Sequence, residues 1–503
     1  MQRSPVLFDR DQEWGDLTEF VRSSGSGLRL GIMYGRRRQG KSFLLRRLVE
    51  ATGGLYVMPL EESRVPALRR FADQVAAELL GMPGAMRFDS WDAALRAALA
   101  ALPRAAARRD VPPVLVLDEL PYLLAHSPEI PSVLQRLYDE SRMDPDAAPV
   151  RVVVCGSALS VMSELLSGTR ALRGRATLDL CLRPFTFREA ADFWQIADSD
   201  VAFAVHAVLG GTPGYRDLVT QPPPARVADL GAWLGGHVLN PAHALFGETD
   251  YLLREDPRLT DRALYHSVLA AIAAGASTPT QIGAAVGRPA QGLAHPLNLL
   301  LTAGFVERTE DVLLRRRPKL SLADPIVRFH HLVTEPRLAQ VEERLAAQVW
   351  AASTDTFASN ILGPHFEQLA RVWTARYGRQ EGLAEPVGPV GPTVVNDRAG
   401  RSQHEIDVAG LAAGQSLHAA DPRLVVLGEA KHAARPRTTS DLERLERLRA
   451  LLVGRGVDAA GAQLILFARA GPDAALRKAA AARDDVLVID LAALYGRPAR
   501  RAR

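Results

Sequence analysis

The stretch GRRRQGKS, residues 35–42, decides how the rest of the sequence is interpreted. It matches the pattern G-x-x-x-x-G-K-[ST], in which the glycines let backbone N–H groups close around phosphates. The apolar run LRLGIMY (residues 28–34) precedes it, and FLLRRLVEA (residues 43–51), with helical spacing, follows it. Strand, glycine-rich loop and helix form the context that a phosphate-binding loop requires. The sequence therefore predicts an α/β fold with a nucleotide site at this loop.

Individual residues of the loop have expected roles. Lys41 is expected to reach the β- and γ-phosphates, and Ser42 to ligate Mg²⁺. Lys41 is also one of only four lysines among 61 basic residues, and a compact ammonium is not replaced by a guanidinium. The remaining loop residues expected to line the nucleotide are Gly35, Gln39 and Gly40. Arginines at 36–38 either contact nucleic acid or form a solvated, charged loop surface, and we favour the second interpretation.

Two further strands are expected to end beside this loop. VLVLDE (residues 114–119) ends in two carboxylates. Asp118 would hold Mg²⁺, and Glu119 would orient or polarise the attacking water. RVVVC (residues 151–155) leads to Ser157, a small polar residue that can sense the γ-phosphate at a strand tip.

Six segments resemble a prokaryotic AAA+/STAND-like P-loop ATPase family that is best known from archaea. They are, in order, FDRDQE (8–13), YGRRRQGKS (34–42), GS (156–157), LRGR (172–175), RPFTFRE (183–189) and GGTP (210–213). The resemblance implies an ATPase that uses ATP and Mg²⁺, with Pro213 approaching the adenine. It also suggests a homo-oligomer in which an arginine finger acts across the interface, with Arg170, Arg173 and Arg175 as candidates.

Composition limits the class of protein. With 503 residues, three or four domains are expected. A net charge of +4 and a pI near 9.2 permit a nucleic-acid partner without requiring one. Two cysteines exclude a disulfide framework. Because no apolar run approaches about 18 residues, we expect a soluble, cytoplasmic protein with no membrane partner.

We expect four parts along the chain. They are a P-loop ATPase core (1–195), a helical lid (196–260), a winged helix-turn-helix (261–345) and an α/β restriction-endonuclease-like domain of the PD-(D/E)XK type (346–503). The lid is expected because its helical patterns are broken by QPPP (221–224).

The winged helix is expected because three helical patterns precede an alternating, turning segment (305–324) that reads as a two-stranded wing. In a DNA complex, the third helix would present Arg288, Gln291 and His295 to a groove. Phosphates would be contacted from the wing by Arg315, Arg316, Arg317 and Lys319. The alternative is an interdomain spacer, and Pro296 argues against groove reading because proline removes a backbone donor.

The C-terminal part carries the pattern of a metal-dependent nuclease. In LVVLGEAK (424–431), the period of two places Glu429 and Lys431 on one face, and Asp407 joins them if EIDVAGL (405–411) is the neighbouring strand. Asp407 and Glu429 could hold Mg²⁺ while Lys431 positions water or stabilises phosphoryl charge. This D…E-x-K order, with Glu367 upstream, resembles the PD-(D/E)XK nuclease fold.

Two functions follow. The first is an ATP-binding and ATP-hydrolysing, DNA-associated ATPase with a nuclease-like C-terminal domain that cuts DNA. The second is a regulatory or signalling STAND-like ATPase whose winged helix and inactive nuclease-like domain bind partners.

Overall fold

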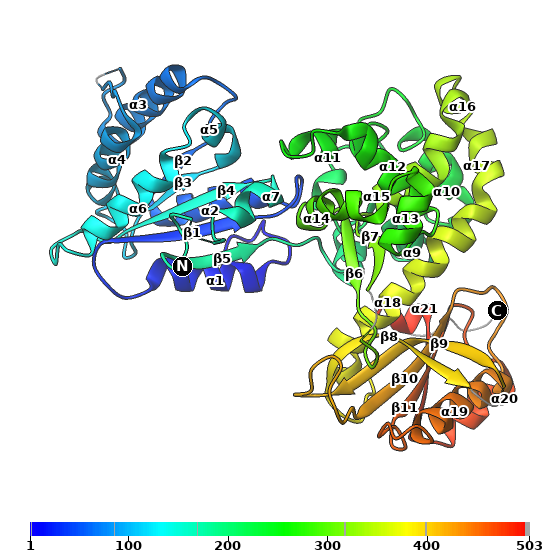
Figure 1. Ribbon diagram of the computed structural model, residues 1–503. Coiled ribbons are helices and arrows are strands. Elements are labelled where there is room, and N and C mark those ends of the chain that lie inside the picture. The colour runs from blue at the N-terminus through cyan, green and yellow to red at the C-terminus, as the bar shows by residue number, and fades with distance from the viewer. Residues whose placement is uncertain (2, 85, 169, 316–317, 398–399, 498–503) are drawn as a thin grey trace.

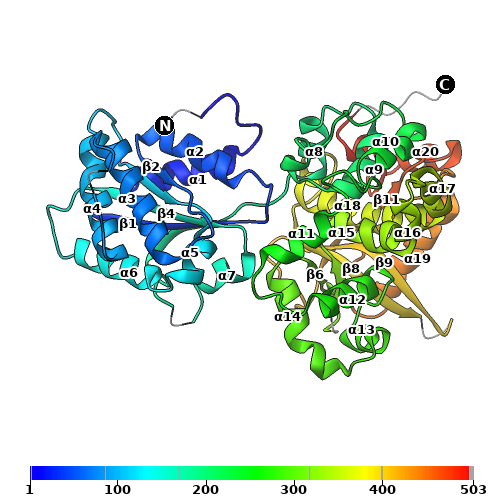
Figure 2. The same ribbon diagram turned by 90° about the horizontal axis from the view of Figure 1, so that it is seen from above.

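The computed structural model describes residues 1, 3–84, 86–168, 170–315, 318–397 and 400–497. The described chain forms an N-terminal α/β part, a central helical part beside it and a C-terminal α/β part below the central one (Figure 1). Seen from above, α7 of the N-terminal part lies next to α11 and α14 of the central part (Figure 2). None of the described helices is long and apolar enough to cross a membrane.

The N-terminal part is built on a five-stranded parallel sheet in the order β2-β3-β4-β1-β5. Its strands are β1 (Leu28–Tyr34), β2 (Leu55–Val57), β3 (Val114–Leu117), β4 (Val150–Gly156) and β5 (Ala176–Cys181). Its helices are α1 (Asp11–Arg22), α2 (Lys41–Thr52), α3 (Arg64–Leu80), α4 (Trp91–Ala105), α5 (Leu120–His126), α6 (Ile130–Ser141) and α7 (Leu159–Glu164).

Helices cover both faces of this sheet, which is why its strands are nearly continuous apolar runs. Alternate strand residues such as Ile32 and Leu115 pack with α3, α4 and α6. Their neighbours Met33 and Val116 pack with α1 and α2 on the other face. Because all five strands are parallel, the ends of β1, β3 and β4 meet at one edge of the sheet.

The central part is mainly helical and shares one hydrophobic core with the adjoining face of the C-terminal sheet, so the expected lid and winged helix pack together. Its first elements are α8 (Phe187–Phe193), α9 (Ser199–Leu209), η1 (Pro213–Tyr215), η2 (Val227–Asp229), α10 (Leu230–Gly236) and α11 (Glu248–Glu255). Next come α12 (Arg262–Ala273), α13 (Pro279–Val286), η3 (Ala290–Leu293), α14 (Ala294–Thr302) and the antiparallel strands β6 (Val306–Thr309) and β7 (Lys319–Leu322). It closes with α15 (Pro325–Phe329), η4 (His330–Thr334), η5 (Glu335–Arg337), α16 (Leu338–Glu342), α17 (Ala346–Thr356) and η6 (Phe357–Leu362).

Two features of the central part differ from the sequence-based expectation. Pro296 lies in the first turn of α14, where backbone N–H groups have no intrahelical partner, so it does not break the helix. Residues 346–362, which we assigned to the C-terminal domain, form α17 and η6, and α17 packs on α10 through Trp350 and Gly231.

The C-terminal part is a mixed sheet in the order β12-β11-β10-β9-β8, with β8–β9 and β9–β10 antiparallel and the other pairs parallel. Its strands are β8 (Val387–Asp397), β9 (Ser402–Ala412), β10 (Leu424–Lys431), β11 (Gln463–Ala468) and β12 (Val486–Asp490). Its helices are α18 (Gly363–Arg376), η7 (Gly378–Gln380), α19 (Thr439–Val453), α20 (Ala474–Ala481) and α21 (Leu491–Leu494). α18 packs on β8, β9 and β10, whereas α19 and α20 pack on the other face.

The connection between β6 and β7 contacts the C-terminal domain (Figure 1). Val312 is buried in the core of that domain, its N–H donates to the Pro392 carbonyl at 3.0 Å, and its carbonyl accepts from the His418 N–H at 3.2 Å. Thr393 Oγ1 donates to Asp311 Oδ1 at 2.8 Å. The expected wing is therefore an interdomain contact along much of its length.

Candidate functional site

The glycine-rich loop places Lys41 at the first turn of α2. Its Nζ donates to the carbonyls of Gly35 (2.7 Å) and Arg36 (2.9 Å), which hold the ammonium inside the loop. Gly40 has φ of 89°, a conformation that favours glycine. A Cβ on Gly35 would lie 2.4 Å from the Leu182 carbonyl oxygen, so this position also requires glycine.

Ser42 and Asp118 form a ligand set suited to Mg²⁺. Ser42 Oγ donates to Asp118 Oδ2 at 2.6 Å, and the Asp118 side chain is fully buried. The hydroxyl of Tyr56 donates to the same carboxylate oxygen. Burial and then the Asp118 carboxylate raise the pKa of Tyr56, which keeps this hydroxyl protonated as a donor. Oxygen donors of this kind are those that Mg²⁺ prefers. Tyr56 was not predicted, because its place beside Asp118 depends on the pairing of β2 with β3.

Glu119 and Ser157 are brought together at the same edge of the sheet. Glu119 adopts a left-handed backbone conformation with φ of 46°. Its Oε2 accepts from the Ser157 N–H at 3.3 Å and from Ser157 Oγ at 3.1 Å. The expected water-orienting carboxylate and the expected γ-phosphate sensor therefore contact each other.

A cavity of about 600 Å³ connects the phosphate loop to an apolar pocket. Lys41, Ser42 and Glu119 line its polar end, and Gln39 and Gly40 lie along it. The apolar end, which sequence reasoning identified only through Pro213, is also lined by Val6, Phe8, Phe193 and Leu218. Phe8 contacts the rings of Phe185 and Phe193 edge-on, with centroids 5.5 and 5.3 Å apart, and remains 40% exposed.

The three arginines of the loop are ion-paired, which corrects the expectation of a solvated charged surface. Arg36 pairs with Asp324 at 2.6 Å, and Arg37 with Glu255 at 2.7 Å. Arg38 binds Glu248 through two nitrogens at 2.9 and 3.3 Å, and the Glu248 side chain is only 1% exposed. All three partners belong to the central part. The arginines thus attach the phosphate loop to α11 and to the segment after β7.

The candidate arginine fingers differ in their surroundings. Arg175 is held within the chain by two hydrogen bonds of 2.9 Å to Asp139, and Arg170 is paired with Glu164. Arg173 is exposed and donates to the Gly168 carbonyl at 2.6 Å. Among the described residues, Arg173 forms no ion pair, so it could reach another subunit without breaking one.

The C-terminal sheet brings Asp407, Glu429 and Lys431 together. Lys431 Nζ lies 3.4 Å from Asp407 Oδ2 and 3.5 Å from Glu429 Oε1. Both carboxylates are buried, and Asp407 Oδ2 also accepts from the Ala430 N–H at 2.9 Å. The positions follow from antiparallel pairing of β9 with β10, in which Val408 lies opposite Gly428.

Two other features modify this constellation. Glu367 of α18 faces it, and burial, followed by the Asp407 charge, raises the pKa of Glu367 to about 7. Glu429 is also contacted by cations: Arg444 binds its Oε1, and Arg437 lies 3.8 Å from the same oxygen. Among the described residues, Glu367, Asp407 and Glu429 do not converge as a three-carboxylate metal cluster.

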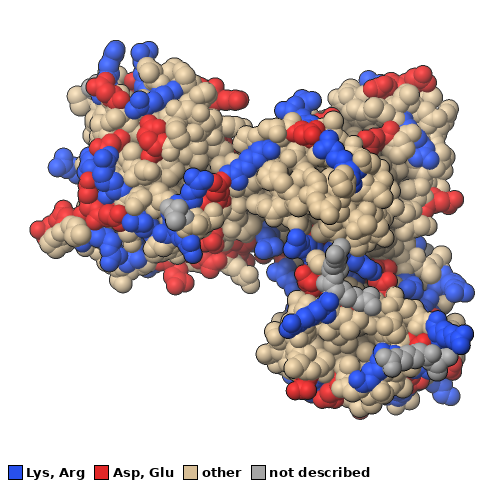
Figure 3. Space-filling view, in the orientation of Figure 1, with Lys and Arg blue, Asp and Glu red and all other residues tan. Residues whose placement is uncertain are grey.

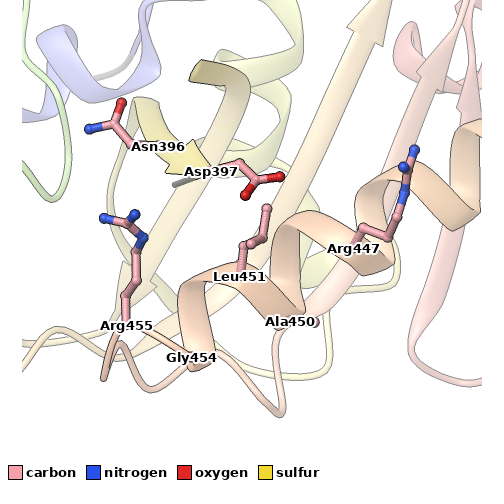
Figure 4. A pocket seen from close by; sticks show the side chains of 7 residues that line it. All are labelled: Asn396, Asp397, Arg447, Ala450, Leu451, Gly454 and Arg455. Carbon is pink, nitrogen blue, oxygen red and sulfur yellow. The ribbon is translucent and has the colours of Figure 1, made fainter. Parts of the chain in front are cut away.

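A separate hollow of about 780 Å³ lies between the end of β8 and α19 (Figure 4). Asp397 and Arg447 line it, together with Arg455 and Leu451. None of the three residues Asp407, Glu429 and Lys431 is part of this lining.

The expected DNA-contacting residues divide into two groups. Arg288, Gln291 and His295 are exposed at the start of η3 and α14, and Arg288 lies 3.9 Å from Asp261. Lys319, expected to bind phosphate, instead pairs with Glu405 of the C-terminal sheet at 2.6 Å. Arg315 is exposed, and Arg316 and Arg317 lie outside the described residues. Lysine and arginine side chains gather where the central and C-terminal parts meet (Figure 3).

The parallel sheet, the glycine-rich loop and the carboxylates at 118 and 119 define the N-terminal part as a P-loop nucleotide-binding fold. Residues 7–215 match the model of an ATPase domain described as predominantly from Archaea. The match ends before most of the central helices.

Relatives with wider coverage are distant. An uncharacterized protein of Methanocaldococcus jannaschii is 24% identical over 343 residues, which are 67% of this chain and 71% of the relative. A Walker-type ATPase of Pyrococcus abyssi aligns with 18% identity and a TM-score of 0.46 over 65% of this chain and 97% of that one. The Aeropyrum pernix ORC1 protein, solved in complex with DNA, aligns with 16% identity and a TM-score of 0.30 over 67% and 95%. Neither TM-score establishes a shared overall fold.

Proposed function

We propose that the N-terminal part binds ATP with Mg²⁺ and hydrolyses it. The observation that carries this proposal is the cavity that joins Lys41, Ser42 and Glu119 to a pocket lined by Phe8 and Phe193. Its polar end suits a triphosphate, and its aromatic end suits a purine base. The ATPase-domain match over residues 7–215 supports the same reaction.

In this proposal each residue of the site has its own role. Lys41 exchanges the carbonyls of Gly35 and Arg36 for phosphate oxygens. Ser42 and Asp118 would hold Mg²⁺, which would supply positive charge to offset that of the phosphates. Glu119 orients the attacking water and accepts its proton. In the structure, the Ser157 hydroxyl donates a hydrogen bond to Glu119. A bound γ-phosphate would compete for this hydroxyl and release the Glu119 carboxylate.

Equilibrium binding of ATP to the full chain tests the phosphate grip. We expect Lys41→Ala to weaken binding by about 10- to 100-fold or more, because one charge-assisted interaction contributes about 1.5–3 kcal/mol. Lys478→Ala, which removes an exposed lysine of α20, is the matched control and should bind as the wild type does. Unchanged affinity of Lys41→Ala would refute the site, and equal affinity for GTP would refute the choice of adenine.

We further propose that the protein acts on DNA and that its C-terminal part is a PD-(D/E)XK nuclease-like domain. The supporting observation is the contact of Lys431 with both Asp407 and Glu429. In this proposal the two carboxylates hold Mg²⁺ and Lys431 positions the attacking water. The exposed Arg288, Gln291 and His295 form the candidate duplex contact.

A second candidate function is a regulatory ATPase whose C-terminal domain binds partners without cutting. Two observations favour it. Arg444 binds Oε1 of Glu429, and Arg437 lies 3.8 Å from the same oxygen, which a metal would need. The expected wing contacts the C-terminal domain through Val312 and Lys319, which limits its reach to DNA.

Metal-dependent cleavage and binding of labelled duplex DNA distinguish the two functions. Asp407→Ala and Glu429→Ala should abolish cleavage and leave DNA binding and ATP hydrolysis intact. Lys431→Ala should slow cleavage by about 10²–10⁴-fold, the scale of one acid–base or electrostatic group. Lys431→Arg should also be slow, because a planar guanidinium does not replace the ammonium. No cleavage by the wild type with Mg²⁺ or Mn²⁺, with or without ATP, would contradict the nuclease proposal and leave the regulatory function.

A further inference from the structure

A cluster of metal-ligating side chains lies in the central part, in the turn that follows α15. His330 and His331 are in η4, and Glu335 begins η5. One ligand atom from each of these residues lies within 4.8 Å of the other two. Of the described residues, only these bring three or more histidine, cysteine or carboxylate ligands so close together. The cluster belongs to neither proposed catalytic site.

The geometry of His331 favours a bound ligand. Its side chain is fully buried, and its Nδ1 lies 2.6 Å from Glu335 Oε2. Its Nε2 is buried without a hydrogen-bond partner, which is costly for a polar atom. The turn is π-helical, a rare backbone form that is found frequently at functional sites.

We propose that His330, His331 and Glu335 bind a divalent transition-metal ion of the zinc class. Two imidazole nitrogens and one carboxylate oxygen are a set that suits Zn²⁺ and leaves a fourth position for water. Imidazole binds metal ions in its neutral form.

One further polar pair, His266 and Asp250, lies beside the cluster. The ring of His266, in α12, lies 5.7 Å from the ring of His331, and its Nε2 is 3.1 Å from Asp250 Oδ1 in α11. An ion at the turn would therefore stabilise its packing against α11 and α12. α11 also carries Glu248 and Glu255, which pair with Arg38 and Arg37 of the phosphate loop. The proposed metal site would therefore lie near the helix that contacts this loop.

Calorimetric titration of the full chain with Zn²⁺ tests this site. The protein is first stripped with EDTA and exchanged into buffer with excess Mg²⁺, which occupies oxygen-rich sites such as those at Asp118 and Asp407. We expect one Zn²⁺ per chain. Glu335→Gln and His330→Gln should each weaken binding by at least about 10-fold, since even outer partners of metal ligands matter by 10–100-fold.

Three further measurements make the result specific. His126→Gln, an exposed histidine of α5, and Asp407→Ala should bind Zn²⁺ as the wild type does. Zn²⁺ should raise the melting temperature of the wild type and not that of Glu335→Gln, a change at a side chain that is 43% exposed and tolerated by the fold. The proposal is overturned if the wild type takes up no Zn²⁺, if both cluster variants bind it unchanged, or if Asp407→Ala removes the binding.

Discussion

Asp118 shows how one residue of the nucleotide site depends on distant neighbours. The local pattern VLVLDE was sufficient to predict that this carboxylate follows a buried strand, because an apolar strand that ends in acidic residues is a feature of P-loop folds. Its second hydroxyl partner, Tyr56, was missed. Tyr56 lies 62 positions earlier in the chain, and no pattern around it marks a ligand-site residue. Contacts of this kind come from strand pairing, which a single sequence does not display.

Removing the Tyr56 hydroxyl should weaken metal binding without removing the nucleotide. Tyr56→Phe removes one of the two hydroxyl groups that donate to Asp118 Oδ2 and leaves the hydrogen bond from Ser42. We expect the Mg²⁺ concentration needed for half-maximal ATP hydrolysis to rise by about 10-fold, the lower end of the range for outer partners of a metal ligand. Tyr138→Phe, in α6, is the control. The same Mg²⁺ dependence in Tyr56→Phe and the wild type would show that the hydroxyl does not orient Asp118.

Among the elements, the phosphate loop and α11 form the least expected pair. The sequence predicted the strand, loop and helix around residues 28–51 because each has its own local pattern. It did not reveal what residues 36–38 contact, because their partners lie more than 200 positions away. Arginine is also so common in this chain that its presence alone carries little information. In the structure the three arginines connect the glycine-rich loop to the central part.

Glu248→Gln tests this connection. The change removes the charge of a buried carboxylate and leaves the Arg38 guanidinium, 22% exposed, without its counter-charge. Breaking such a buried pair should lower the free energy of unfolding by about 3 kcal/mol or more. Glu50→Gln is the matched control, since the pair of Glu50 with Arg47 is exposed and should cost at most about 0.5 kcal/mol. Equal losses in the two variants by chemical denaturation would argue against a structural role for the Arg38–Glu248 pair.

At the scale of the whole molecule, the sequence predicted the kinds of parts better than their contacts. Both α/β parts were foreseen because their strands are apolar runs that end in chemically distinctive residues. The docking of the β6–β7 connection was not foreseen. Val312 lies in a wing pattern but is buried in the C-terminal core, and Lys319 pairs with Glu405 rather than remaining free. These contacts join the central part to the candidate nuclease domain, so the three parts form one connected body.

We propose above that the N-terminal site hydrolyses ATP and that Glu119 orients the attacking water. Single-turnover hydrolysis of γ-labelled ATP by wild type and Glu119→Gln tests this proposal, with the full chain in excess over ATP, at a concentration that binds all of it, and with saturating Mg²⁺. We expect Glu119→Gln to bind ATP as tightly as the wild type and to hydrolyse it about 10²–10⁴-fold more slowly. A hydrolysis rate equal to that of the wild type, at equal ATP occupancy, would contradict the account.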